Sequence, residues 1–400
     1  MNLFFGNYDF EHHLGSTLPR VLPAQIRRLN VEMAFCLVPL AQRGDCVWAS
    51  ALPDAGYSQH LEAIGLPGVR FVSRSDEIPA GAALVPWGWC KSVVDWAAQL
   101  GCDFNAPQLA AVAAVNSREF SSGLEAEWTV GLPEARAIRT LAELDSTLAE
   151  AAKLTNGWVI KANFGMSARE RILTRCSPPR PQDVQWARHR LQRGEPLFFE
   201  PWVESLAEFG CQFSVPRTGS PVLEGITGLL TDAQGTYRGS RLFGEAESPP
   251  SNLLPPSILE LVERAAQRIQ ERGYFGPLGI DVMQYRAADG EIRWRPLQDI
   301  NARLTMGRVA LGLRRLLGPG ERGDWLHFRQ PAGSAPVAGQ IPIASGDFPK
   351  GVRTVRTSPL EVGGAPSSHQ SALIIAPPTE TLEAVFSAMR EVHEARPGLI

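Results

Sequence analysis

The sequence predicts two kinds of architecture in one chain, an α/β domain followed by a larger α+β region. Short apolar segments alternate with helical patterns through residues 1–106, which is typical of a small parallel sheet. Two helices with N-terminal capping signals follow, starting at Thr140 and Ser257. Two strand-like segments, 278–286 and 291–301, flank a polar turn and predict an antiparallel pair. A chain of 400 residues is long enough for two or three packed units.

The composition excludes several classes of function. Hydrophobic residues make up 44% and charged residues 20%, as in a globular protein. The net charge is −3 with no basic block, which argues against binding nucleic acid or a membrane surface. The most apolar run, 31–41, is too short to span a bilayer, and the N-terminus lacks a signal-peptide pattern. We therefore expect a cytoplasmic protein.

The cysteines lie far apart and form no C-x-x-C pair. We expect reduced, mostly buried thiols, with neither a disulfide framework nor a zinc site. They are Cys36, Cys46, Cys90, Cys102, Cys176 and Cys211.

The first 106 residues show four strand patterns and three helical ones. The strands are predicted at 1–7, 45–50, 69–73 and 83–87, and the helices at 23–40, 58–64 and 91–100, the last two ending at Gly65 and Gly101. The loops 6–13 and 87–89 follow strands, where open α/β sheets bind ligands, so they are candidate parts of a substrate pocket. For His12 and His13 we favour solvent exposure or capping over metal binding, and for Trp87 and Trp89 packing over recognition.

The middle of the chain carries a candidate phosphate site. A helix over 107–115 leads to Asn116-Ser117-Arg118, and a second helix begins at Thr140. A strand over 158–161 ends in Lys161 and is followed by a loop of mostly small residues. A lysine supplies a point charge and such a loop supplies backbone N–H groups, which together suit phosphate binding. A helix over 183–193 and an apolar strand near 196–200 come next.

Three oxygen-bearing side chains mark the predicted strand pair. Asp299 and Asn301 are two residues apart, so a strand points them to one face, and the pairing can bring Asp281 opposite them. Two carboxylates and an amide oxygen suit Mg²⁺ bound together with substrate phosphates. Arg303 follows at the same spacing and could reach such a phosphate. The alternative is a solvated sheet face without a metal.

The C-terminal part is less informative. Gly318–Gly323 matches G-x-G-x-x-G, but it follows a helical stretch at 309–317 and contains Pro319, so we interpret it as a turn and not a dinucleotide site. A strand is predicted at 372–376 and an amphipathic helix at 379–393.

The segments GIDVMQY (279–285) and LQDINARLTMG (297–307) resemble the end of the ATP-grasp domain, where a strand carrying Asp precedes a strand ending in Glu-x-Asn-x-Arg. Asp299 replaces the usual Glu. The resemblance implies a pre-ATP-grasp α/β domain at 1–106 and a two-subdomain ATP-grasp fold at 107–330, with a lid subdomain at about 119–199. Residues 331–400 would be an appendage packed on the ATP-grasp lobe.

The resemblance also implies a role for each matching residue. The loop after Lys161 reads Ser167-Ala168-Arg169-Glu170 and lacks both glycines of the family's Ser-Gly-Arg-Gly. The implied nucleotide contacts are Arg118, Lys161 and Arg169, an adenine hinge at Glu200, Pro201 and Val203, and a ribose-binding Glu208. The implied metal ligands are Asp281, Asp299 and Asn301, and the implied catalytic residues are Arg303 and Asn301.

The activity implied is an ATP-dependent, ADP-forming ligation of a small-molecule carboxylate to an amine through an acyl phosphate. ATP and Mg²⁺, or Mn²⁺ in its place, would be the cofactors. The resemblance also implies a homodimer. Glutamate is one candidate substrate, and the family includes enzymes that add it to methanofuran- or methanopterin-type cofactors. Two alternatives stay open: a phosphotransferase, and a nucleotide-binding regulator with weakened catalysis.

Overall fold

The first domain contains a parallel sheet, as the sequence predicts. The computed structural model describes residues 1–15, 24–165, 170–175, 178–244, 250–329 and 351–377. Four parallel strands lie in the order β3-β2-β1-β4. They are β1 (Asn2–Phe5), β2 (Cys46–Trp48), β3 (Arg70–Val72) and β4 (Ala83–Pro86). Helices α3 (Tyr57–Ala63) and α4 (Lys91–Leu100) end before Gly65 and Gly101, as predicted, and both glycines have positive φ.

The predicted helix over 23–40 changes type midway. α1 (Phe10–Leu14) precedes it, α2 (Ala24–Met33) is α-helical, and η1 (Ala34–Leu40) continues as a 3₁₀ helix. Pro39 lies inside η1, and its missing N–H removes a hydrogen bond that an α-helix would require. All residues of η1 from Ala34 to Pro39 are buried, so this segment belongs to the core. A short 3₁₀ turn, η2 (Ser75–Glu77), precedes β4.

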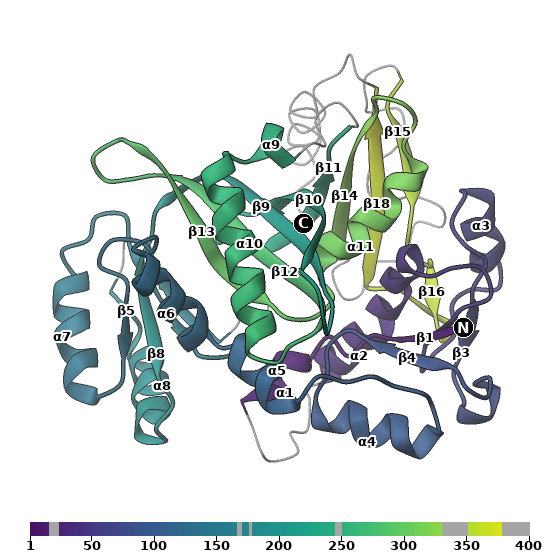
Figure 1. Cartoon of the computed structure of the whole chain (residues 1–400), viewed down its shortest axis with the longest axis horizontal. Coiled ribbons are helices and arrows are strands. Elements are labelled where there is room, and N and C mark those ends of the chain that lie inside the picture. The colour runs from purple at the N-terminus through teal and green to yellow at the C-terminus, as the bar shows by residue number, and fades with distance from the viewer. Residues whose placement is uncertain (16–23, 166–169, 176–177, 245–249, 330–350, 378–400) are drawn as a thin grey trace.

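A second, smaller sheet has its own hydrophobic core. Its antiparallel strands lie in the order β5-β8-β6-β7. The strands are β5 (Arg136–Ile138), β6 (Trp158–Ala162), β7 (Arg171–Thr174) and β8 (Leu197–Pro201). α7 (Leu141–Ala151) has the predicted capping box between Thr140 and Glu143, and α8 (Pro181–Gln192) begins earlier than predicted because Pro181 occupies its first turn. This sheet and its helices form the left end of the molecule in Figure 1.

The largest sheet has eight strands in the order β13-β12-β9-β10-β11-β14-β18-β15. In chain order they are β9 (Glu204–Val215), β10 (Val222–Thr231), β11 (Tyr237–Leu242), β12 (Gly276–Arg286), β13 (Ile292–Asn301), β14 (Arg322–Arg329), β15 (Arg353–Arg356) and β18 (His369–Ala376). Every neighbouring pair is antiparallel. β18 contains the strand predicted at 372–376.

Helices accompany this sheet and link it to the other two. They are α5 (Leu109–Val115), α6 (Arg118–Trp128), α9 (Pro250–Leu253), α10 (Pro256–Glu271), α11 (Met306–Gly312) and η3 (Leu313–Leu316). The capping box predicted at Ser257 is wrong: α10 begins at Pro256, and Pro255 is its N-cap without a side-chain bond. Proline is favoured in a first turn, where its missing N–H costs nothing. The predicted helix over 309–317 begins earlier, at Met306, with Thr305 as its N-cap.

The predicted strand pair at 278–301 is confirmed. β12 and β13 pair antiparallel, and Gly290 in the turn has φ +87. The interpretation of Gly318–Gly323 as a turn is also confirmed, because residues 318–321 connect η3 to β14, which begins at Arg322. A two-stranded ribbon of β16 (Glu361–Val362) and β17 (Ala365–Pro366) lies near α3 in Figure 1. The helix predicted over 379–393 lies outside the described residues.

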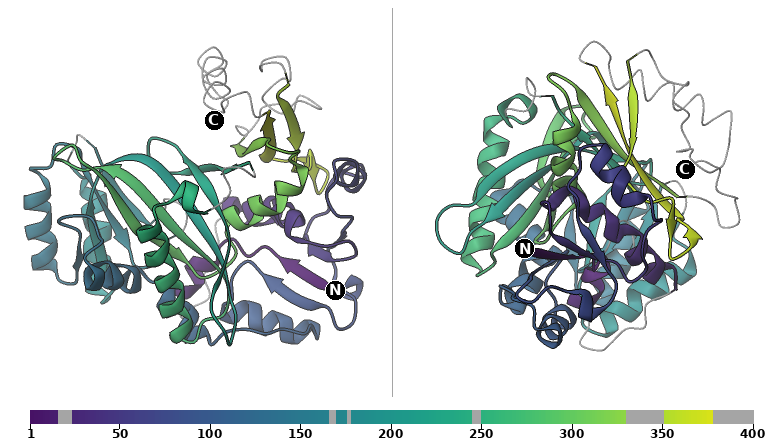
Figure 2. Two further views of the ribbon diagram at one scale, coloured as in Figure 1. Left: turned by 45° about the horizontal axis from the view of Figure 1, so that its top comes forward. Right: turned by 90° about the vertical axis from the view of Figure 1, so that its right-hand side faces the viewer.

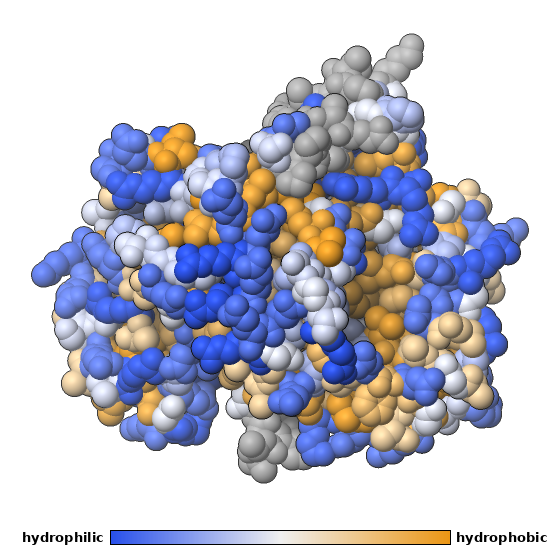
Figure 3. Space-filling model, in the orientation of Figure 1, coloured by the Kyte–Doolittle hydropathy of each residue, from blue (hydrophilic) through white to orange (hydrophobic). Residues whose placement is uncertain are grey.

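The three sheets lie side by side, with the large sheet between the small sheet and the first domain (Figures 1 and 2). Hydrophilic residues cover much of the face seen in Figure 3, and hydrophobic residues gather right of its centre. Among the described residues, no helix is long and apolar enough to cross a membrane.

Candidate active site

The three predicted metal ligands are brought together on β12 and β13. Asp281 and Asp299 are direct partners across the two strands. Asn301 Nδ2 donates to Asp281 Oδ2 at 3.3 Å. Burial and the negative charge of Asp299 raise the pKa of Asp281 well above its usual range, although Arg303 and the Asn301 bond oppose this. The oxygen-only donor set and the raised pKa both fit a site for a divalent cation, because a cation would compensate the two carboxylates.

Arg303 is held at this end of β13 by the first domain. Its Nε donates to Glu11 Oε1 at 2.6 Å, and its Nη2 donates to Asn301 Oδ1 at 2.8 Å. The guanidinium carbon lies 5.3 Å from the centre of the Trp87 ring. Trp87 is buried, as expected of a packing residue, but it also forms one wall against Arg303. Glu11, in the loop predicted to border a pocket, was not singled out from the sequence.

Arg118 approaches the same acids from α6. Its Nη1 lies 3.4 Å from Asp299 Oδ1. Ser117 caps the helix by accepting from Phe120 N, and Asn116 Oδ1 accepts from Ala302 N at 2.9 Å. The Asn-Ser-Arg segment is therefore fixed against the end of β13. Arg118 N also donates to Asn163 O at 3.0 Å, which ties this segment to the end of β6.

Lys161 lies in a buried network of charges between the small and the large sheet. Its Nζ is 2.7 Å from Glu200 Oε2. Arg295 on β13 pairs with Glu200 (2.9 Å) and with Glu125 on α6 (2.6 Å), with all three side chains buried. Burial lowers the pKa of Lys161, and Glu200 only partly offsets this. Burial alone would raise the pKa of Glu200, but the charges of Arg295 and Lys161 hold it far below its usual range.

Sequence reasoning missed Glu125 and Arg295. One signal in the sequence could have pointed to Arg295. It is separated from Asp299 and Asn301 by an even number of positions on the same predicted strand, so strand alternation assigns it to the same face. Glu200 was predicted to lie in an adenine hinge, and the structure shows that its side chain holds Lys161.

The predicted hinge borders an apolar wall. Val203 packs against a cluster that includes Leu132, Met283 and Tyr285. Pro201 ends β8, and the backbone N–H of Trp202 donates to Gly157 O at 3.0 Å. Glu208 lies opposite Met283 and accepts from Ser205 Oγ at 2.9 Å, and burial raises its pKa. Arg169 lies outside the described residues.

The loop after β1 borders a cavity of about 270 Å³ at the carboxyl ends of β1 and β2. Its lining includes Phe5, Asn7, Asp9, His13, Trp48 and Trp96. Asp9 accepts from Asn30 Nδ2 and lies 2.6 Å from His13 Nε2, and that bond raises the pKa of His13 against the effect of burial. His13 is thus paired with a carboxylate.

The fold is shared with solved ATP-grasp structures. No protein-family model and no curated protein matches the chain. An ADP complex of N5-carboxyaminoimidazole ribonucleotide synthetase matches with a TM-score of 0.52 and 10% identity over 99% of this chain and 97% of that chain. The Thermus thermophilus synthetase matches with a TM-score of 0.52 and 15% identity over 98% and 97% of the two chains.

A third structure is the biotin carboxylase domain dimer of the Hydrogenobacter thermophilus 2-oxoglutarate carboxylase. It contains magnesium ADP, ADP and bicarbonate, and matches with a TM-score of 0.51 and 13% identity over 90% and 87% of the two chains. This chain therefore has the ATP-grasp fold. A parallel α/β domain precedes its antiparallel ATP-grasp sheets.

Proposed function

We propose that this protein is an ATP-dependent, ADP-forming ligase that joins a small-molecule carboxylate to an amine. The observation that carries the proposal is the placement of Asp281, Asp299 and Asn301 between two arginines, Arg118 and Arg303. Phosphoryl transfer between oxygens requires positioned charges more than a nucleophilic side chain. This arrangement supplies negative groups to hold a cation and positive groups to hold phosphate and carboxylate.

The nucleotide would lie between the small and the large sheet. Lys161 and Arg118 approach from the small sheet and α6 and would contact its phosphates, with Arg169 as a further candidate. The backbone of Pro201 and Val203 would pair with the adenine edge, and Glu208 with the ribose. Asp281, Asp299 and Asn301 would hold Mg²⁺ or Mn²⁺, which neutralises charge on the transferring phosphoryl group.

Two steps complete the reaction. A carboxylate oxygen attacks the γ-phosphorus, the bond to the ADP oxygen breaks, and an acyl phosphate forms. The amine nitrogen then attacks the carbonyl carbon, phosphate leaves and the nitrogen loses a proton, which gives an amide. Arg303 has its orientation fixed by Glu11 and Asn301, so it can hold the carboxylate and then the charge that develops on its oxygen.

The cavity beyond β1 and β2 is our candidate for the acceptor pocket. Helix α1, which follows β1, carries Glu11, which orients Arg303, and the N-cap of this helix is Asp9, which lines the cavity. Aromatic side chains and a buried carboxylate would suit an amine with an apolar or aromatic part. In this proposal the first domain would bind the acceptor amine, and the large sheet would hold the activated acyl group.

We also propose that residues 119–199 act as a lid. From β5 onward this range has its own core, with Ile138, Leu144, Ile160 and Phe199, whereas Leu124 on α6 belongs to the main core. A unit with its own core can move as a body and close over a bound nucleotide. A homodimer is part of the same proposal, since the similar Hydrogenobacter domain is a dimer.

The test is ADP release from Mg²⁺-ATP with a panel of carboxylates and amines, singly and in pairs, and mass spectrometry of the products. The carboxylates should include glutamate and bicarbonate, because the Hydrogenobacter structure contains bicarbonate. We expect ADP to form only with a particular pair, and a product lighter than their sum by one water.

Two outcomes would replace the proposal. ADP together with one phosphorylated hydroxyl compound would establish a phosphotransferase. Tight ATP binding without turnover for any pair would favour the nucleotide-binding regulator.

A further inference from the structure

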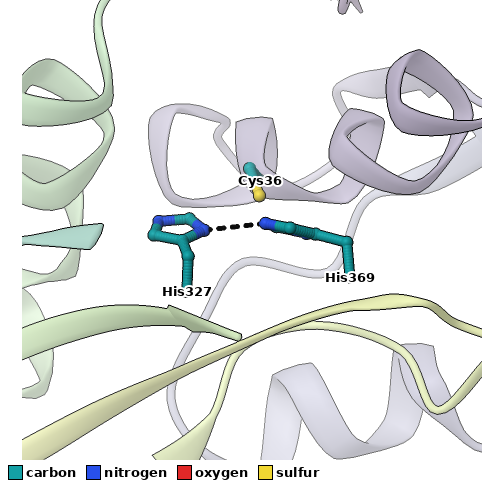
Figure 4. A group of neighbouring side chains, drawn as sticks. All are labelled: Cys36, His327 and His369. Atoms are coloured by element: carbon teal, nitrogen blue, oxygen red, sulfur yellow. Dashed lines mark hydrogen bonds between the residues drawn. The ribbon is translucent and has the colours of Figure 1, made fainter. Parts of the chain in front are cut away.

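Three potential metal ligands meet in a second place, apart from the acids on β12 and β13. Cys36 lies on η1, His327 on β14 and His369 on β18, and one donor atom from each lies within 4.8 Å of the other two. His327 Nδ1 and His369 Nε2 are 3.1 Å apart. Figure 4 shows these two nitrogens facing each other, with the sulfur of Cys36 pointing toward the space between them.

The donor types suit zinc, and small side-chain shifts would bring the three donor atoms to the spacing that zinc requires. Zinc–nitrogen bonds of about 2.0–2.1 Å and zinc–sulfur bonds of about 2.3 Å place tetrahedral ligand atoms roughly 3.3–3.8 Å apart. The nitrogen pair is already near that spacing. Thiolate and imidazole are preferred by zinc, whereas magnesium prefers oxygen ligands. We propose that Cys36, His327 and His369 bind one Zn²⁺ ion, with the fourth position left to water.

Neighbouring contacts hold the imidazole of His327 in place. The ring of Trp325 lies edge-on to the imidazole of His327, with 4.3 Å between the ring centres, and the centre of the Tyr237 ring is 5.6 Å from that of the imidazole. Trp325 is fully buried, and its Nε1 donates to Thr357 Oγ1 at 2.8 Å. A ligand whose orientation is fixed by packing loses little freedom when it binds a metal.

The position suggests what the metal does. η1 belongs to the first domain, while β14 and β18 belong to the far half of the large sheet. The same boundary carries bonds from Tyr57 Oη to Thr357 O (2.7 Å) and from Ser368 Oγ to Glu32 Oε2 (2.6 Å). A zinc ion here would join segments far apart in the sequence across this boundary. This linking role is independent of the ligase proposal.

The experiment replaces zinc by Co²⁺ in the full chain after treatment with a chelator. A thiolate ligand gives a near-ultraviolet charge-transfer band that oxygen and nitrogen ligands do not give. We expect this band to saturate at one equivalent and to disappear when Zn²⁺ is added. Cys36→Ser should abolish the band, whereas Cys102→Ser, at a buried cysteine after α4, should keep it. Asp281→Asn should also keep it, which separates this site from the magnesium site.

A second readout covers the case in which Cys36→Ser does not fold. Zinc should raise the melting temperature of the chelator-treated wild type, and His369→Gln should bind zinc at least tenfold more weakly and lose that rise. The proposal is overturned if wild type shows no charge-transfer band, if Cys36→Ser or His369→Gln binds as tightly as wild type, or if zinc leaves the melting temperature unchanged. The histidines would then be a hydrogen-bonded pair without a metal.

Discussion

Arg303 at the end of β13 donates to Glu11 on the first helix of the chain, with 2.6 Å between Arg303 Nε and Glu11 Oε1. The two residues are 292 positions apart, and both are largely buried. The bond makes the first domain part of the candidate active site, because the direction of Arg303 is set from there. In the proposed ligase, the acceptor-binding domain thus also positions the group that contacts the acyl donor.

Glu11→Gln should lower kcat/KM by about 10²-fold, because a small misplacement of a positioning group costs that much. The amide keeps the acceptor oxygen but loses the charge that orients Arg303. Steady-state ADP release measures the effect. Glu62→Gln, at an exposed glutamate, is the control and should behave as wild type. Unchanged kcat/KM for Glu11→Gln would show that Arg303 does not act through this bond.

Asp281→Asn and Asp299→Asn should each abolish Mg²⁺-dependent ADP formation and leave the fold intact. Because the pKa of Asp281 is raised, its charged form destabilises the folded protein without a cation. Asp281→Asn should therefore melt no lower than wild type when Mg²⁺ is absent. Circular dichroism and a thermal melt test this, with the exposed Asp289→Asn as control. Full activity in either variant would contradict the metal site.

Glu200→Gln should destabilise the protein by about 3–5 kcal/mol at pH 7, because it leaves Lys161 and Arg295 without their shared buried carboxylate. The pKa of Glu200 is lowered on folding, so its contribution is present above the ordinary pKa of 4.5 and is lost as the pH falls further. The difference in unfolding free energy should shrink below that pH. Urea titrations over a pH series measure it, with the exposed Glu204→Gln for comparison. A pH-independent difference would refute the charge pairing.

Lys161→Ala should raise the KM for ATP by about 10–100-fold, which corresponds to the loss of one charge-assisted hydrogen bond of about 1.5–3 kcal/mol. The exposed Lys153→Ala should leave the KM unchanged. ATP binding can be followed by calorimetry with either variant. Equal affinities would mean that Lys161 serves only to neutralise Glu200.

Local pattern was enough to predict the strand pair that carries the acids. Asp281, Asp299 and Asn301 lie on adjacent strands joined by a short turn. Strand alternation therefore predicts which face they share, and the turn predicts that the two strands pair. The same holds for the presence of a parallel sheet of short strands in the first domain and for the capped helix after Thr140. The helix after Pro255 was misplaced at its start, because two competing start signals, a first-turn proline and Ser257, lie side by side.

Contacts between distant segments could not be predicted in this way. Arg295 and Glu125 are 170 residues apart, and nothing in the spacing of either residue indicates the other. The same is true of Cys36, which we expected to be an ordinary buried thiol, and of the two histidines that face it. Such contacts depend on how the three sheets pack against one another. Periodic patterns and residue spacings within one sequence do not reveal that packing.

The strand order of the large sheet has a consequence for how the chain folds during synthesis. β14 pairs with β11 on one side, but its other edge is covered by β18, whose last residue is Ala376. Until that residue has left the ribosome, β14 presents a row of unpaired backbone groups next to apolar side chains such as Leu326 and Phe328. We therefore expect nascent chains that stop before β18 to aggregate or to engage chaperones, whereas the sheet of the first domain has all four of its strands once β4 has left the ribosome and can form early.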